Sequence, residues 1–297
     1  MYDARSSTGD NANIVFGVVT LVVVGLAFAL AWFGSGLLGG NGSGGSGKLA
    51  AANPVVIASD SPLLQAFPSA DEQRLLSALA SLDKNRYAEL EADIAKARGR
   101  DKQIELLGEA TGRALLDNAD HLAHVSAADL NGMLDAATSA LTKVKANSRE
   151  LCLGSTYSDF EHLSPRQAQR EAERLMQRAG FDKESAHAMG VAMQADLLEM
   201  TLRARANPQR HGKLTSQDEA AFESLLMSFM TDPAFMRIAM ADNQQQAMAN
   251  LNVCDMGLKV LREVRRLPDG TKARAWASVF DMPEFRRGLR QAKNFSF

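Results

Sequence analysis

Residues 14–33 read IVFGVVTLVVVGLAFALAWF, twenty consecutive positions without a charged side chain. At a rise of ~1.5 Å per residue, a helix of this length covers roughly 30 Å, the thickness of one hydrocarbon core. Trp32 lies at the far end of the run, where an interfacial aromatic ring is favoured. The stretch Ile14–Phe33 therefore predicts a single transmembrane helix that anchors the chain in a membrane.

The same run also resembles the apolar part of a cleavable signal peptide, because residues 27–29 (AFA) fit a cleavage site. Against cleavage, the polar tail 1–13 carries Arg5 as its only cationic side chain, and the apolar run exceeds the ~7–15 residues usual for a signal peptide. Arg5 precedes the run and Lys48 is the first cation after it, which favours a cytoplasmic N-terminus. We expect a single-pass protein of the inner or cell membrane, with its domain in the periplasm or outside the cell.

Two linker segments of different composition follow the apolar run. Residues 34–47 read GSGLLGGNGSGGSG, and such Gly/Ser composition is typical of a flexible tether. Residues 48–68 contain three prolines, which forbid a continuous helix. Residues 34–68 are therefore predicted to be a linker that does not couple the domain rigidly to its anchor.

The remainder of the chain carries repeated signals for the start of a helix. Residues 69–72 (SADE) and 216–219 (SQDE) have the capping-box pattern, a hydroxyl residue followed three positions later by Glu. Residues 164–167 (SPRQ) and 232–233 (DP) place proline at the first helical position after a capping side chain. Residues 244–266 are predicted to form one long helix.

These signals predict an all-α fold. Aromatic residues make up only 6% of the chain, and helix-forming residues dominate after the anchor. Helical periodicity is lost over residues 147–163, so we expect an irregular helical bundle with two subdomains, residues 69–146 and the Met-rich residues 147–297. The chain has no Gly-rich phosphate loop and no alternation of strands with helices, and we expect no bound cofactor.

Charge is distributed unevenly along the chain. The net charge of −2 argues against a protein that binds nucleic acid over its whole surface. From residue 257 onward, ten Lys and Arg residues stand against four acidic residues, which gives this segment a charge of +6. Such a basic segment can meet anionic lipid headgroups, an acidic partner or the acidic remainder of its own domain.

The chain has two cysteines, Cys152 and Cys254. In an exported domain such a pair favours a disulfide, and a bond that closes a loop of about 100 residues stabilises the fold by roughly 4–5 kcal/mol in the chain-entropy description. In a cytosolic domain the alternative is two buried free thiols. Because we expect export, the sequence predicts a disulfide between Cys152 and Cys254.

The densest group of metal-ligand residue types lies on one short stretch. His121 and His124 share a helix face, and Asp117 and Asp120 each precede one of them by four residues. Imidazole and carboxylate groups are ligands for divalent transition metals, so these four residues are the candidate metal site. The alternative is a pair of ordinary Asp–His contacts on a solvent-facing helix.

Methionine is concentrated in the second half of the chain, where ten of the thirteen lie between residues 176 and 256. Because the thioether side chain adapts to irregular surfaces, a Met-rich groove can hold a partner helix or an acyl chain. A Met-rich core and a Cu(I) site are the alternatives. The candidate groove residues are Met189, Met193, Leu197, Met200, Met227 and Met230.

Cys152 and His162, with acidic residues between them, are the ingredients of a thiol nucleophile, but no catalytic signature accompanies them. The sequence therefore favours a membrane-anchored interaction or scaffold module with a protein partner, and it gives no evident catalytic site. One alternative is a domain that binds a lipid or acyl chain in the Met-rich groove. The other is a metal-binding or thiol enzyme.

Overall fold

The computed structural model describes residues 61–157, 183–241 and 243–283, with single positions at 167, 171, 174, 175, 177, 178, 285 and 287. Within these residues the regular secondary structure is helical, and one isolated antiparallel bridge joins Leu153 to Asn252. The predicted all-α class is confirmed for this part of the chain. The predicted anchor Ile14–Phe33 and residues 34–60 of the predicted linker lie outside the described residues. Among the described helices, none has both the length and the apolar character needed to span a bilayer.

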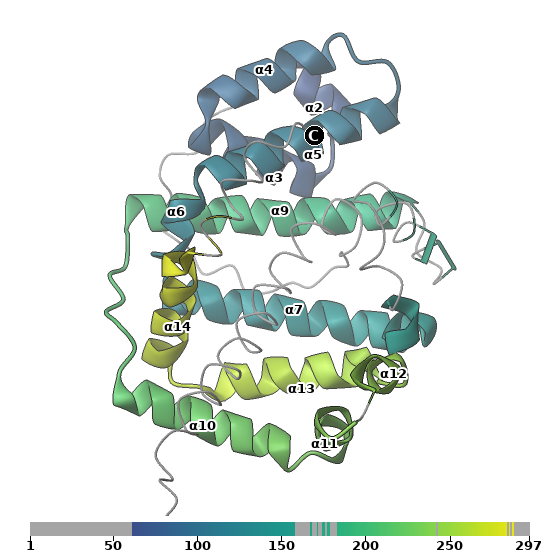
Figure 1. The fold of residues 1–297 in the computed structure, drawn as a ribbon. Coiled ribbons are helices and arrows are strands. Elements are labelled where there is room, and N and C mark those ends of the chain that lie inside the picture. Colours follow the sequence, from purple (N-terminus) through teal and green to yellow (C-terminus); the bar gives the residue numbers. More distant parts are fainter. Residues whose placement is uncertain are drawn as a thin grey trace, which may run out of the picture. The chain divides into compact units, whose positions relative to one another are not determined.

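The chain forms two compact units, each built from segments that are far apart in the sequence (Figure 1). The described residues of unit 1 are 130–157, 212–241 and 243–275, with the single positions between 167 and 178. Those of unit 2 are 61–129, 183–211 and 276–283, with positions 285 and 287. Two boundaries between the units fall inside α7 (Ala127–Asn147) and α14 (Asp269–Asp281), and two others fall at 182/183 and 211/212.

Unit 2 is assembled from six helices in its described residues, and the first of them starts inside the predicted linker. Ser61 caps this helix and Pro62 opens it, so residues 61–68 belong to the folded unit. The predicted capping box at Ser69 and Glu72 is confirmed at the start of the second helix. The helices are α2 (Pro62–Ala66), α3 (Ala70–Leu82), α4 (Lys84–Ile94), α5 (Arg100–Asp117), α6 (Ala119–Leu122) and α9 (Lys183–Ala206).

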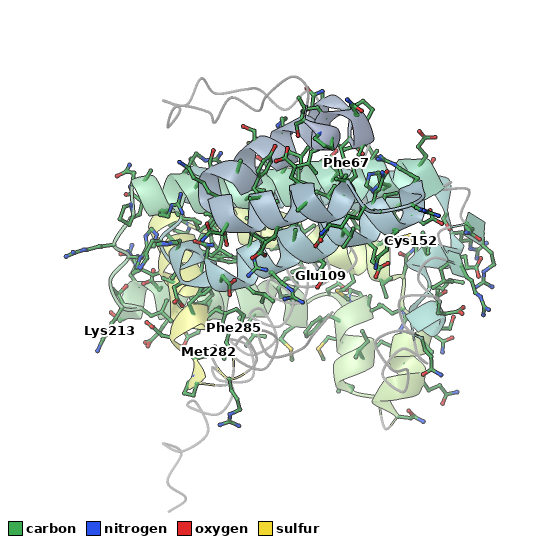
Figure 2. All side chains as sticks on the ribbon, turned by 90° about the horizontal axis from the view of Figure 1, so that it is seen from above. Phe67, Glu109, Cys152, Lys213, Met282 and Phe285 are labelled. Atoms are coloured by element: carbon green, nitrogen blue, oxygen red, sulfur yellow. A yellow bond between two sulfur atoms is a disulfide. The ribbon has the colours of Figure 1, made fainter. Side chains whose placement is uncertain are left out.

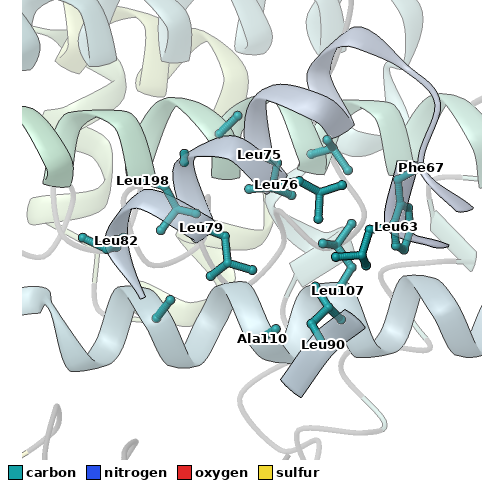
Figure 3. Packing of buried hydrophobic residues seen from close by; sticks show 14 of the residues in the cluster. Leu63, Phe67, Leu75, Leu76, Leu79, Leu82, Leu90, Leu107, Ala110 and Leu198 are labelled. Carbon is teal, nitrogen blue, oxygen red and sulfur yellow. The ribbon is translucent and has the colours of Figure 1, made fainter. Parts of the chain in front are cut away.

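The core of unit 2 is a cluster of leucines between α3, α5 and α9 (Figure 3). Leu75, Leu79 and Leu198 are fully buried in it, and Phe67 closes one end of the cluster from the α2–α3 turn. The helices α3 and α9 run in the same direction, because Glu72 near the start of α3 meets the start of α9 while the end of α3 accepts hydrogen bonds from Arg205 near the end of α9. The α9 helix lies within the segment predicted to form the Met-rich half, and it packs on α3.

Unit 1 is built mainly from helices of the second half of the chain. The α9 helix and residues 276–281 of α14 belong instead to unit 2. Unit 1 also contains two short 3-10 helices, η1 (Glu150–Cys152) and η2 (Gly154–Tyr157). Its α-helices are residues 130–147 of α7, α10 (Ser216–Met230), α11 (Pro233–Ala239), α12 (Gln244–Ala249), α13 (Val253–Arg266) and residues 269–275 of α14. The predicted start at Asp232 and Pro233 is confirmed, because Asp232 caps α11.

Two sequence predictions in unit 1 are wrong in detail. The capping box of α10 uses Thr215 and Asp218, one residue earlier than the predicted pair, because Asp218 is drawn into the core while Glu219 remains on the surface. The predicted long helix over residues 244–266 is broken into α12 and α13. The break occurs because Asn252 caps α13 and the preceding carbonyl, that of Leu251, accepts a hydrogen bond from outside the helix.

The α7 and α13 helices of unit 1 are antiparallel neighbours (Figure 1). Asp135 near the middle of α7 pairs with Arg265 near the end of α13, whereas Lys145 near the end of α7 pairs with Asp255 near the start of α13. Between these pairs the side chain of Leu141 lies against Gly257, where an added Cβ would be 2.7 Å from Leu141 Cδ2. Ion pairs at both ends and a glycine between them fix the register of the two helices.

Candidate functional site

A disulfide between Cys152 and Cys254 fastens the end of η1 to the first turn of α13 in unit 1. Cys152 is labelled in Figure 2. The two Cα atoms are 5.0 Å apart, and both side chains are buried. The predicted disulfide is therefore present, and it joins residues separated by 102 positions in the sequence. Because both sulfurs are bonded, Cys152 has no thiol to ionise, and the nucleophile of the thiol-enzyme alternative is absent from this state.

Backbone contacts beside the disulfide explain why α12 and α13 are separate helices. Gly154 N donates to Leu251 O at 2.8 Å, and Leu153 forms the isolated bridge with Asn252. Asn252 Oδ1 then accepts from Asp255 N at 3.0 Å and begins α13. The disulfide and these contacts together hold the 3-10 segment against the start of α13.

The α10 helix presents a buried and an exposed stripe of side chains. Asp218, Phe222, Leu225 and Phe229 recur at helical spacing and are buried. The exposed side of the helix carries two acids followed by two methionines, and we call these four residues the α10 stripe. It consists of Glu219, Glu223, Met227 and Met230, all of which are exposed.

The buried stripe begins with an ionised carboxylate. Asp218 is fully buried, and it accepts hydrogen bonds from Arg274 Nε at 2.7 Å, Thr271 Oγ1 at 2.6 Å and the Thr215 backbone at 2.8 Å. The bond from Arg274 is the largest cause that lowers the pKa of Asp218 well below its usual value, and it outweighs the opposing effect of burial. This cluster locks the start of α10 onto the first turn of α14.

A second cationic contact holds the end of α10 to its neighbours. Phe229 stacks on Phe235 of α11 with ring centroids 5.6 Å apart, and Lys259 of α13 lies 5.8 Å from the Phe229 ring centre. The ammonium of Lys259 donates to Asp232 Oδ2 at 2.5 Å and lowers the pKa of that carboxyl. The inner face of α10 is therefore fixed at both ends, which leaves its outer face rigidly displayed.

Several cations of the basic segment that begins at residue 257 pair with acids inside unit 1. Lys259, Arg265 and Arg274 pair with acids of three other elements of unit 1, and Lys272 pairs with Asp269 within α14. The sequence left anionic lipid headgroups, an acidic partner or the acidic remainder of the same domain as possible binding partners for these cations. The described ion pairs are all with acids of the same unit.

The predicted groove residues fall into two groups. Met200 is buried in unit 2, with Met193 and Leu197 partly buried on the same helix, α9. Met227 and Met230 are exposed on α10 of unit 1, with exposed fractions of 61% and 39%. The side chain of Met189 lies outside the described residues. The two groups belong to different units, and the groove itself remains a prediction.

The candidate metal ligands are engaged separately. Asp117 pairs with Arg86 at 3.1 Å, and His124 Nδ1 lies 3.2 Å from the carbonyl oxygen of Gln209. His121 and Asp120 lie on the short α6 helix. Across the described residues, no three His, Cys, Asp or Glu side chains are grouped closely enough to hold a metal ion.

One polar cluster of unit 2 was not singled out from the sequence. Glu72 is almost fully buried, and its carboxylate contacts Arg100 and lies 2.9 Å from His187 Nε2. Burial raises the pKa of Glu72, but the hydrogen bonds from His187, Ser69 and Arg100 together lower it to about 2. The capping box marked Glu72 as a cap residue, but no local signal indicated its distant partner on α9.

Exposed large apolar side chains complete the surface of unit 1. Among the described residues they are Leu153 at 38%, Met227 at 61%, Met230 at 39% and Met240 at 75% exposed, and all four belong to this unit. Three of the four are methionines that lie on α10 or at the end of α11, two helices that pack together.

Comparison with protein-family models, with curated proteins and with solved structures finds no match to this chain.

Proposed function

We propose that this protein is a membrane-tethered interaction module whose helical domain lies outside the cytoplasm and binds a protein partner. The observation that carries the proposal is the gathering of exposed methionines on α10 and α11 of unit 1. Exposed apolar side chains that cluster on a surface are typical of interaction sites, and methionine is frequent in adaptable ones. The fixed inner face of α10 supports a preformed surface rather than one that folds on binding.

The disulfide supports the proposed location of the domain outside the cytoplasm. Disulfides form and persist in oxidising compartments, and they are rare in the cytosol. The pair Cys152–Cys254 is buried and bonded, so a domain in the periplasm or outside the cell accounts for it. The twenty-residue apolar stretch Ile14–Phe33 would hold such a domain at the membrane, and the Gly/Ser segment would give it a short flexible reach.

Cross-linking in intact cells tests this proposal. An amine-reactive reagent that does not cross membranes is added to cells of the native organism that produce the full chain. Lys213 is exposed three residues before α10 and offers a reactive amine there (Figure 2). We expect a discrete conjugate with one second protein, with cross-linked peptides mapped to Lys213. A domain that is shielded from the reagent, or that forms no conjugate at any lysine, would overturn the proposal.

A further inference from the structure

The outward face of α10 has an ordered chemical pattern. Glu219, Glu223, Met227 and Met230 follow one another at intervals of four, four and three residues, which places them on one line along the helix. At ~1.5 Å per residue, the α10 stripe extends over roughly 16 Å, about three turns. One end of the stripe is anionic and the other end is a pair of thioethers.

Among the residues that the structure describes, no cation forms an ion pair with the acids of the stripe. The α10 helix, Ser216–Met230, contains no Lys, Arg or His. Within the described part of the chain, neither Glu219 nor Glu223 forms an ion pair, whereas the buried neighbour Asp218 binds Arg274. The adjoining helix α11 carries one cation, Arg237, which is exposed and pairs with neither acid. Within the described residues, the acidic end of the stripe is therefore an exposed negative surface without an ion-pair partner.

The methionines of the stripe are positioned but not packed. Their helix is fixed from within by Phe222, Leu225 and Phe229, so Met227 and Met230 cannot turn inward without breaking that core. Covering an exposed apolar side chain is favourable, and an unbranched thioether adjusts to the shape of what covers it. The stripe thus combines a rigid backbone with adaptable contact atoms.

We propose that the α10 stripe binds an amphipathic helix of a partner protein that carries two cations one turn apart, followed along the same face by two apolar side chains. The cations pair with Glu219 and Glu223, and the apolar residues cover Met227 and Met230. This proposal rests on the proposed function and adds the surface and the chemistry of the partner. Charge complementarity selects such a helix over an anionic lipid surface, which the two glutamates would repel.

The test uses the full chain in zwitterionic nanodiscs with the methionine methyl groups labelled for NMR. The probe is a synthetic alanine-based helical peptide with two lysines one turn apart and two leucines further along the same face. We expect the methyl signals of Met227 and Met230 to shift on titration, while the signal of buried Met200 stays in place. Binding should weaken as salt is raised, because the ion pairs are at the surface.

A charge exchange separates this site from unspecific attraction. The variant Glu219→Lys/Glu223→Lys should lose about tenfold or more in affinity for the lysine peptide and should bind a matched peptide with glutamates instead. The matched control is Glu89→Lys/Glu184→Lys, which makes the same change in charge at exposed positions of unit 2 and should leave the affinity unchanged. Met227→Ser/Met230→Ser should weaken both peptides about equally.

Several outcomes would overturn the proposal. Equal affinity of the lysine peptide for the original chain and for the charge-reversed chain would exclude the glutamates as its site. Methionine shifts caused by nanodisc lipid alone would assign the stripe to acyl chains, and shifts that grow with protein concentration would assign it to a second copy of the chain. If the conjugate found in intact cells persists in the charge-reversed variant, this surface is refuted while the proposed function stands.

Discussion

Removing the disulfide is expected to destabilise unit 1 by a calculable amount. The bond joins residues separated by 102 positions, and closing a loop of that size restricts the unfolded chain by roughly 4.7 kcal/mol in the chain-entropy description. Both sulfurs are buried, so Cys152→Ala/Cys254→Ala also leaves a small void, which adds to the loss. The contacts of Gly154 with Leu251 and of Leu153 with Asn252 lose the covalent link beside them.

Urea denaturation of the full chain, followed by far-ultraviolet circular dichroism, measures this loss. With a dependence of about 2 kcal/mol per molar urea, the midpoint for unit 1 should fall by roughly 2 M. Each single variant should show most of the loss of the double variant, because the bond needs both sulfurs and the void contributes only a smaller part. Reduction of the original chain keeps both sulfurs and should also show most of that loss, and the reductant should not change the double variant.

The reasoning fails under either of two results. An unchanged urea midpoint in Cys152→Ala/Cys254→Ala would mean that closing the loop does not lower the conformational entropy of the unfolded chain by the expected amount. Losses in the two single variants that add up in the double variant would mean that the two side chains stabilise independently through packing.

Four further substitutions test other features of the structure. Asp218→Asn should lower the free energy of unfolding by roughly 2–4 kcal/mol in urea denaturation, because Arg274 and Thr271 lose a charged acceptor. A decrease in that free energy no larger than the one caused by an exposed substitution would contradict this prediction. The pKa of Glu72 is lowered to about 2 from its usual 4.5, so on the order of 3 kcal/mol of stability that is present above pH 4.5 should be lost as the pH falls toward 2, and Glu72→Gln should remove that slope from an acid titration. Gly108→Ala, where an added Cβ meets nothing within 4 Å, should raise thermal stability by about 0.5–1 kcal/mol. The free energy of unfolding of Gly257→Ala should be about 1–3 kcal/mol lower than that of Gly108→Ala, because the added Cβ meets Leu141, and Leu141→Ala should relieve this contact.

Local sequence predicted much of the fold because helix starts are local events. The cap at Ser69 and the start at Asp232 follow from side chains that bond backbone groups within three residues, and both are found where the sequence places them. The start of α10 shows the limit of such signals. Thr215 and Ser216 are each followed by an acid three residues later, so two capping boxes compete at adjacent positions.

Tertiary contacts decide that competition. Arg274 and Thr271 draw Asp218 into the core, which fixes the earlier register and turns Glu219 outward. The buried Phe222, Leu225 and Phe229 fix the inward face of α10, and the α10 stripe is the exposed side that remains. From the sequence alone, Met227 and Met230 were candidates for a groove, and the sequence could not show that they stand on the outward face of a fixed helix.

The sequence by itself determined the all-α class and the start of several helices, because composition and capping act without reference to distant parts of the chain. It favoured a disulfide only on the expectation of export, and the fold brings Cys152 and Cys254 together across 102 positions. Only the tertiary structure decided that 244–266 breaks before Cys254 and that Lys259 and Arg265 pair with acids of unit 1. Helix propensity is continuous through that break. The helix is interrupted there because Leu251 O accepts a hydrogen bond from Gly154 and Asn252 Oδ1 accepts one from Asp255 N. The disulfide between Cys152 and Cys254 holds the 3-10 segment beside this break.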